Sequence, residues 1–251
     1  MQSGPAQKPQ RLPGGGVRRQ GPTQFPSASN SHPKFEDYRS IPRRRFAILV
    51  GQFQSIRRVL HSVNVYIPPS AMTVQTVAIV GAGTMGNGIA HVFALHGYET
   101  TLIDLDESLL DEARGTIEQN LTRQVEKDAI APADRADALD RLSFTPDTAS
   151  GVAVADLVVE AVPEERSLKA EVFGTLDEHA PDEAILASNT SSISITWIGS
   201  QTDRPDRVVG MHFFNPVPVM TLVEAVRGQR TSDATYDVVA DVADDLGKHP
   251  V

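Results

Sequence analysis

The stretch that most constrains the fold runs from residue 76 to residue 90 and reads TVAIVGAGTMGNGIA. Residues 77–80 are apolar and mostly β-branched, which predicts a strand buried on both faces, as in a parallel sheet. Three glycines follow in the pattern G-x-G-x-x-G, and apolar residues then recur at helical spacing as far as Gly97, a residue typical of a helix C-terminus. A strand, a glycine-rich turn and a helix in this order predict a dinucleotide-binding βαβ unit.

Each of the three glycine positions in the turn requires glycine for a different physical reason. Gly81 allows a tight turn, Gly83 lets the backbone approach a pyrophosphate, and Gly86 lets the helix pack closely on the strand. The helix N-terminus offers unpaired N–H groups and the positive end of its dipole to the phosphates. We therefore expect five residues of this loop to contact a dinucleotide: Gly81, Gly83, Thr84, Met85 and Gly86.

A second apolar segment, residues 99–103, ends in Asp104, which lies 23 positions after Gly81. An acidic residue near this position of a βαβ unit accepts hydrogen bonds from the adenosine ribose. Its charge repels a 2′-phosphate, so NAD is favoured over NADP. A purely structural βαβ unit is the alternative, but the coincidence of strand, turn, helix and acid favours the nucleotide site.

The rest of the chain alternates between strand-like and helix-like segments with short turns. Predicted helices cover residues 107–127, the segment after Pro132, 167–179, a stretch from about 193, and 233–246; predicted strands cover 142–145, 156–160, 184–187, 208–211 and 220–226. This alternation predicts a Rossmann-type, doubly wound α/β fold with a mostly parallel sheet. No apolar run reaches membrane-spanning length, and the absence of cysteine excludes disulfides and thiolate chemistry. The spacing of histidines and acids suggests no metal site.

Charge divides the chain into two segments. Residues 1–71 hold 11 Lys and Arg, 2 Asp and Glu, and 9 of the 17 prolines, whereas residues 72–251 hold 12 Lys and Arg against 30 Asp and Glu. The first composition is typical of disorder. We interpret residues 1–71 as a gene-model artefact, with Met72 as the true start; a targeting extension and a nucleic-acid anchor are the alternatives. The acidic second segment favours a salt-loving source, an ordinary acidic enzyme being the alternative.

Polar residues follow the predicted strands at the edge where doubly wound sheets bind ligands, among them Glu164, Ser191 and His212. A histidine there can act as a general base when a carboxylate fixes its tautomer, and Glu224 is a candidate for that carboxylate. A solvated or core histidine is the alternative. Ser191 either binds a substrate oxygen or caps the helix near residue 193. Glu160 is a possible acid–base partner of Glu164, unless Glu164-Glu165 marks a helix start.

Four segments, in this order and spacing, resemble the 3-hydroxyacyl-CoA dehydrogenase family: GAGTMGNGIA, VVEAVPE, ASNTSS and HFFNPVPVMTLVE. The resemblance covers residues 72–251. It implies an NAD domain that supplies the catalytic residues, followed in the family by a helical domain that completes the substrate site and forms a homodimer. The implied reaction oxidises an (S)-3-hydroxyacyl-CoA to the 3-oxoacyl-CoA with NAD, in fatty acid β-oxidation or 3-hydroxybutyryl-CoA metabolism. We expect no metal, membrane or nucleic-acid partner and a cytoplasmic location.

The resemblance also implies roles for individual residues. His212 is the general base, Glu224 its carboxylate partner, and Ser191 the contact to the 3-oxygen of the substrate. The cofactor contacts are Asp104 at the adenosine ribose and, nearer the nicotinamide, Glu164, Lys169 and Asn215. Where the family uses a serine and a lysine to bind coenzyme A, this chain has Asn120 and Lys127, so only the lysine is kept.

The departure from the family lies at the end of the sequence. The chain stops at GKHPV, whereas the family continues into a Pro-Gly-Phe turn and the helical domain, which carries a catalytic asparagine. We therefore expect a chain truncated before that domain. The alternative to the enzyme is an NAD-binding module without catalysis. A dehydrogenase of small hydroxy acids is a weaker alternative, because it would not need HFFNPVPVM.

Overall fold

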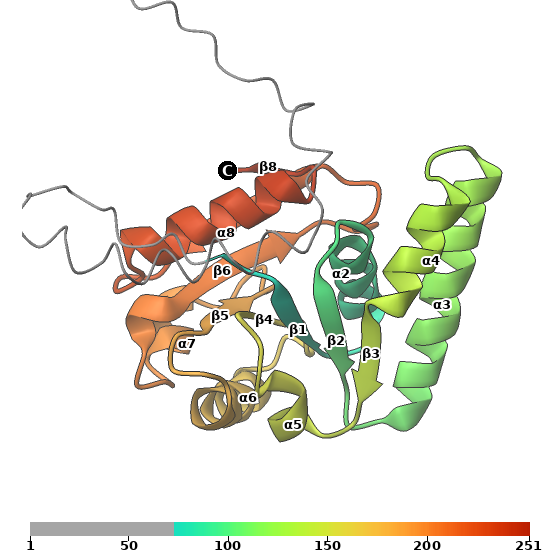
Figure 1. Ribbon diagram of the computed structural model, residues 1–251. Helices are drawn as coiled ribbons and strands as arrows, with labels where there is room; N and C mark the ends of the chain where they lie inside the picture. Colours follow the sequence, from blue (N-terminus) through green and yellow to red (C-terminus); the bar gives the residue numbers. More distant parts are fainter. Residues whose placement is uncertain (1–72) are drawn as a thin grey trace, which may run out of the picture. The chain divides into compact units, whose positions relative to one another are not determined.

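The computed structural model describes residues 73–251, which form an eight-stranded sheet with helices on both faces (Figure 1). The interpretations made for residues 1–71 and Met72 lie outside the described residues. Within the described part of the chain, no helix is both long and apolar enough to cross a membrane.

The strands are arranged in the order β3-β2-β1-β4-β5-β6-β7-β8, and all neighbours are parallel except β6 and β7. β6 and β7 are antiparallel because the short segment 214–221 joins them without a crossover helix. The strand bounds are β1 Thr76–Val80, β2 Glu99–Ile103, β3 Leu142–Thr145, β4 Leu157–Glu160, β5 Ile185–Ser188, β6 Val208–Phe213, β7 Leu222–Arg227 and β8 His249–Pro250.

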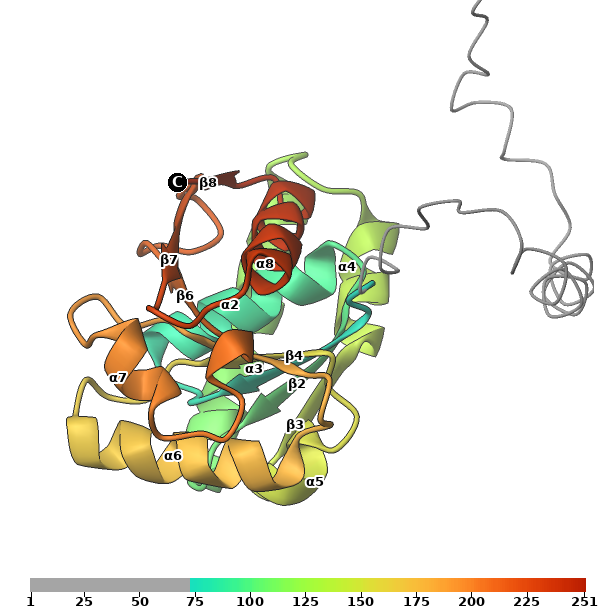
Figure 2. The same cartoon turned by 90° about the vertical axis from the view of Figure 1, so that its left-hand side faces the viewer.

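Two groups of helices cover the two faces of the sheet (Figure 2). The first face packs against α2 Thr84–Leu95, α3 Glu107–Glu126, α4 Pro132–Asp140 and α8 Asp233–Asp245. The second packs against α5 Thr148–Val152, α6 Arg166–His179 and α7 Ile195–Gly199. A 3₁₀ turn, η4, covers Pro205–Arg207.

Alternation along the strands divides the apolar side chains between two cores. In β1, Val77 and Ile79 face the core under α2, whereas Ala78 and Val80 face the core under α5 and α6. Because both faces are covered, all four side chains are buried, which explains why the strand reads as an uninterrupted apolar run. The doubly wound, mostly parallel fold predicted from the sequence is confirmed.

Two local predictions are wrong. The helix expected near residue 193 begins at Ile195, and the hydroxyl of Ser194 accepts the hydrogen bond from Trp197 N, so Ser191 is not its cap. His212 does not follow its strand but lies within β6, because pairing with β7 extends the ladder to Phe213. The helix start considered at Glu164-Glu165 agrees with the structure, in which α6 begins at Arg166 with Glu165 at the N-cap position.

Candidate active site

The glycine-rich loop between β1 and α2 has the close contacts that require glycine. Gly81 has φ +104°, and a Cβ there would lie 2.8 Å from the carbonyl oxygen of Ala161. A Cβ at Gly86 would lie 1.7 Å from the carbonyl oxygen of Gly81, so α2 begins directly against the turn. At Gly83 no atom lies within 4 Å of such a Cβ, which leaves the backbone on that side open to a ligand.

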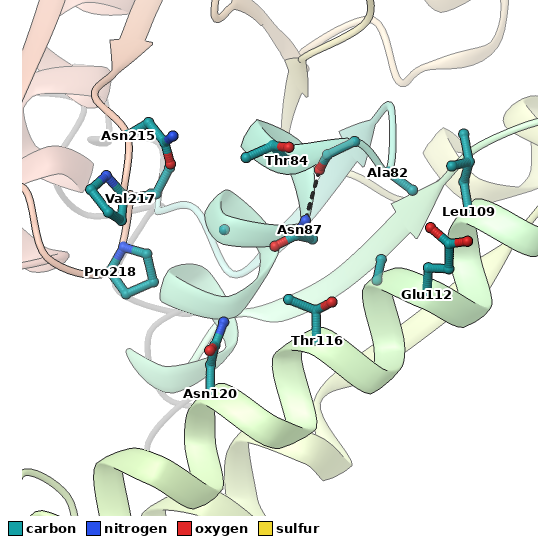
Figure 3. A pocket seen from close by; sticks show the side chains of 14 residues that line it. Ala82, Thr84, Asn87, Leu109, Glu112, Thr116, Asn120, Asn215, Val217 and Pro218 are labelled. Atoms are coloured by element: carbon teal, nitrogen blue, oxygen red, sulfur yellow. Dashed lines mark hydrogen bonds between the residues drawn. The ribbon is translucent and has the colours of Figure 1, made fainter.

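A cavity of about 440 Å³ adjoins this loop (Figure 3). It lies between the start of α2, one face of α3 and the segment that follows β6. Its lining residues are Ala82, Gly83, Thr84, Asn87, Gly88, Leu109, Glu112, Ala113, Thr116, Asn120, Asn215, Pro216, Val217 and Pro218. Gly83 and Thr84 from the predicted phosphate loop thus share one cavity with Asn215. Met85 instead packs its side chain against the core.

Asp104, at the end of β2, is tied to the glycine loop. One carboxylate oxygen accepts a hydrogen bond from Ala82 N at 2.8 Å, and the other accepts from Asp106 N at 3.0 Å. A carboxylate has about four acceptor positions, so these two bonds leave capacity for ribose hydroxyls. The bonds fix the acid at the same strand edge as the phosphate loop.

His212 and Glu224 form a hydrogen-bonded pair across β6 and β7. The two residues are direct partners in the antiparallel register, and His212 Nδ1 lies 2.7 Å from Glu224 Oε2. The His212 side chain is 17% exposed and the Glu224 side chain 44% exposed, so the pair borders solvent. The His212 ring also packs at a tilt against Phe214, with ring centroids 4.7 Å apart. With Nδ1 directed at the carboxylate, Nε2 is the nitrogen left to exchange a proton with a ligand.

Glu164 holds the loop that carries Ser191. Its Oε1 accepts hydrogen bonds from the hydroxyls of Thr190 and Ser192, at 2.5 and 2.8 Å, and from the backbone N–H groups of Ser191 and Ser192. Partial burial raises the pKa of Glu164, but the hydrogen bonds from Thr190 and Ser192, with the nearby Lys169 charge, outweigh it and lower the pKa to about 2. Glu164 is therefore a carboxylate at neutral pH. Ser191, whose N–H it binds, is exposed to solvent.

Lys169 lies beneath Glu164 and is 1% exposed. Its ammonium is 2.6 Å from Glu160 Oε1 and 3.4 Å from Glu164 Oε2. Glu160 is fully buried, and its second oxygen accepts a hydrogen bond from Ser188 Oγ at 2.6 Å. The two glutamates are thus bridged by a lysine rather than paired as acid and base. Buried charges of this kind are tolerated only when opposite charges and hydrogen bonds compensate the loss of water.

Asn189 is a residue that the sequence interpretation missed. Its Oδ1 accepts a hydrogen bond from Phe213 N at 2.8 Å and so links the serine-rich loop after β5 to the histidine strand. The ASNTSS motif was the signal available, but nothing local to it indicates a contact 24 residues away.

A second cavity, of about 300 Å³, adjoins the first. Asn120 lines both, and Lys127 lines the second together with Arg123, Gln124, Ala129, Pro216, Pro218 and Val219. Arg123 donates a hydrogen bond to Asn120 Oδ1 at 3.4 Å. Two cations beside an apolar wall are suited to a ligand with phosphate and apolar parts. Among residues 73–251, no group of three or more His, Asp or Glu side chains is placed to hold a metal ion.

Comparisons with known proteins agree with this geometry. Residues 76–251 match the family described as 3-hydroxyacyl-CoA dehydrogenase, NAD binding domain. A 3-hydroxybutyryl-CoA dehydrogenase of Clostridioides difficile is 42% identical over 175 residues, which cover 70% of this chain and 62% of that protein. The mitochondrial hydroxyacyl-coenzyme A dehydrogenase of Rattus norvegicus is 43% identical over 183 residues, covering 71% of this chain and 58% of the relative.

A solved structure gives the same result. The crystal structure of (S)-3-hydroxybutyryl-CoA dehydrogenase from Ralstonia eutropha superposes with a TM-score of 0.69 at 42% identity, covering 71% of this chain and 63% of that one. The chain thus spans about 60% of the length of the curated relatives it matches. It belongs to the 3-hydroxyacyl-CoA dehydrogenase family, of which residues 76–251 form the NAD-binding domain.

Proposed function

We propose that the protein of this chain catalyses the NAD-dependent oxidation of (S)-3-hydroxyacyl-CoA to 3-oxoacyl-CoA. The observation that carries the proposal is the His212–Glu224 pair, because His212 lies on β6 and the segment that follows β6 lines the cavity beside the glycine loop. The relatives named 3-hydroxybutyryl-CoA dehydrogenase support the substrate class. Bound NAD supplies the hydride acceptor for this chemistry.

In this proposal His212 Nε2 takes the proton of the substrate hydroxyl. Glu224, bonded to Nδ1 at 2.7 Å, fixes the tautomer and ring orientation and stabilises the imidazolium that forms. Because the pair is set by strand register, the base is oriented before substrate binds. This preorganisation avoids a reorientation cost during the reaction.

The open backbone at Gly83 and the start of α2 support a pyrophosphate site, and Asp104 supports binding of the adenosine ribose through its remaining acceptor positions. We assign Asn215 to the nicotinamide side, because it lines the same cavity as Gly83. Glu164 is assigned there too, with Lys169 acting on the cofactor through Glu164 rather than by direct contact, since its side chain is buried.

On the substrate side, we assign the exposed Ser191 to the 3-oxygen. Glu164 supports this role because it holds Ser191 N and both neighbours of Ser191 in one arrangement. The second cavity suits the coenzyme A end, with Lys127 and Asn120 as contacts. Arg123 adds a positive charge beside Asn120, where the family has a serine.

The test uses the full 251-residue chain. We expect NADH to bind in a fluorescence titration and acetoacetyl-CoA to be reduced, as followed by loss of NADH absorbance. His212→Ala should retain NADH binding and lose turnover, and Glu224→Gln should lower kcat by about 100- to 10,000-fold. Gln201→Ala, at a position remote from both cavities, is the control for unspecific damage.

Two other outcomes have distinct meanings. NADH binding without turnover by the wild-type chain would contradict activity of this chain and favour an NAD-binding module. Turnover that survives in His212→Ala would instead show that the base has been assigned wrongly.

A further inference from the structure

The segment between β6 and β7 forms a wall that the two cavities share. Pro216 and Pro218 line both cavities, and Val219 lines the second. Asn215 lines the first cavity, where Figure 3 shows it beside Val217 and Pro218. A proline has no backbone N–H, so the segment has few donors that could hydrogen-bond to its own carbonyl groups. Two turn bonds run to Pro216 O, from the N–H groups of residues 219 and 220.

Lys248 supplies donors to this wall from a turn about 30 residues further along the chain. Its Nζ donates to Val217 O and to Met220 O, each at 2.7 Å. The residue is 6% exposed and lies just after α8, where its own N–H donates to Ala243 O. The next residue, His249, begins β8 and donates its N–H to Thr221 O. The turn after α8 is therefore joined to the wall by side chain and backbone together.

Helix α2 bounds the wall on another side. Val217 is 2% exposed, and a Cβ added at Gly88 would lie 3.0 Å from Val217 Cβ. The wall thus fits between an ammonium that binds two of its carbonyl groups and a helix on which an added methyl group would require the wall to shift by a few tenths of an ångström. Burial lowers the pKa of Lys248, as expected for an ammonium removed from water.

We propose that Lys248 is a positioning residue that sets the wall between the cofactor cavity and the coenzyme A cavity. It holds Val217 O and Met220 O and thereby fixes Asn215 toward the glycine loop and the prolines toward α3. This inference rests on the proposed function for its kinetic readout. Lys248 itself contacts neither cavity, so its effect passes through the backbone of residues 215–220.

The central experiment replaces the ammonium and then restores it. Lys248→Met keeps all of the side chain except the terminal ammonium position and removes the donors. Lys248→Cys can be aminoethylated in the unfolded state and refolded, which rebuilds an ammonium at the same distance from the backbone, and the wild-type chain contains no cysteine to interfere. Arg230→Met, which removes an exposed positive charge, is the matched control.

We expect Lys248→Met to fold, to bind NADH severalfold more weakly and to show a kcat/KM for acetoacetyl-CoA lower by about 10- to 100-fold. The pH midpoint of the reaction, which reports His212, should not move. Aminoethylation of Lys248→Cys should recover most of the loss. A purely space-filling role predicts that Lys248→Met, which fills most of the space of the lysine, keeps wild-type activity, and that result would overturn the proposal.

A second variant tests the wall if Lys248→Met does not fold. Gly88→Ala pushes on Val217 from α2 and should also lower kcat/KM, and full activity with its Cβ accommodated would contradict a wall of fixed position. Failure of the proposed function is recognised separately. A wild-type chain that binds NADH but does not reduce acetoacetyl-CoA would disprove activity, while NADH affinity of the Lys248 variants would still test the wall.

Discussion

Single side chains in this site act mainly by holding other groups, and Glu164 is the clearest case. Its Oε1 accepts hydrogen bonds from three consecutive residues, Thr190, Ser191 and Ser192, and Lys169 lies behind its second oxygen. The carboxylate therefore connects the buried Lys169–Glu160 pair to the exposed serine loop. Its charge state decides whether that loop keeps one arrangement.

The lowered pKa of Glu164 gives a prediction about pH. The carboxyl titrates near 2 when folded and near 4.5 when unperturbed, so its stabilisation of the loop is complete above pH 4.5 and is lost as the pH falls through 2. Ser192→Ala removes one donor and should raise the midpoint toward 4.5. Carboxyl carbon NMR shifts would measure the midpoint, with Ser200→Ala as control. An unchanged midpoint in Ser192→Ala would show that the hydroxyl has no part in the shift.

Residues of this supporting kind are also where sequence interpretation is weakest. His212 and Glu224 could be predicted, because their chemistry is distinctive and β6 and β7 are close in sequence. Asn189 and Lys248 could not, because each binds a backbone group 24 to 31 residues away and no periodicity encodes such a contact. Sequence patterns therefore identify residues with distinctive chemistry more readily than the polar residues that hold the backbone around them.

At the level of elements, the sequence predicts the glycine loop and α2 closely, because Gly81 and Gly86 each meet a steric demand that only glycine satisfies. Short elements were missed: α5 and β8 have five and two residues, too few to show a period. The start of α7 was misplaced because several serines precede it and each is a suitable cap. Only the structure shows that Ser194 accepts the bond from Trp197 N.

The contrast between Gly86 and Gly83 can be tested as a pair. Gly86→Ala places a methyl group 1.7 Å from a backbone oxygen, so α2 must shift, and we expect a loss of about 2–4 kcal/mol in the free energy of unfolding. Gly83→Ala meets no atom and should cost below about 1 kcal/mol, yet weaken NADH binding because its methyl group occupies the open side. Urea unfolding and NADH titration measure the two effects. Equal stability of both variants would contradict the argument.

For the whole molecule, the uneven charge of residues 72–251 is the dominant feature, with 30 Asp and Glu against 12 Lys and Arg. Two of its three lysines, Lys169 and Lys248, are buried, so they contribute little to the surface. Helix α8 carries five aspartates and no Lys or Arg. Asp241 lies four residues from both Asp237 and Asp245, a spacing at which like charges repel. Asp244 lies at the C-terminal, negative end of the helix dipole, which is also unfavourable.

Repulsion of this kind should weaken as salt screens it. We expect the free energy of unfolding to rise between about 0.05 and 1 M KCl, over which the Debye length falls from more than 10 Å to about 3 Å. Asp241→Asn with Asp244→Asn should stabilise the protein in low salt by about 0.5–1.5 kcal/mol and flatten the salt dependence. Asp245 stays unchanged because Tyr98 bonds to it. Urea unfolding at each salt concentration is the measurement, with the uncharged change Gln229→Ala as control. If the double variant keeps the wild-type slope, the salt response does not come from α8, and stability indifferent to salt would rule out adaptation of this acidic surface to high salt.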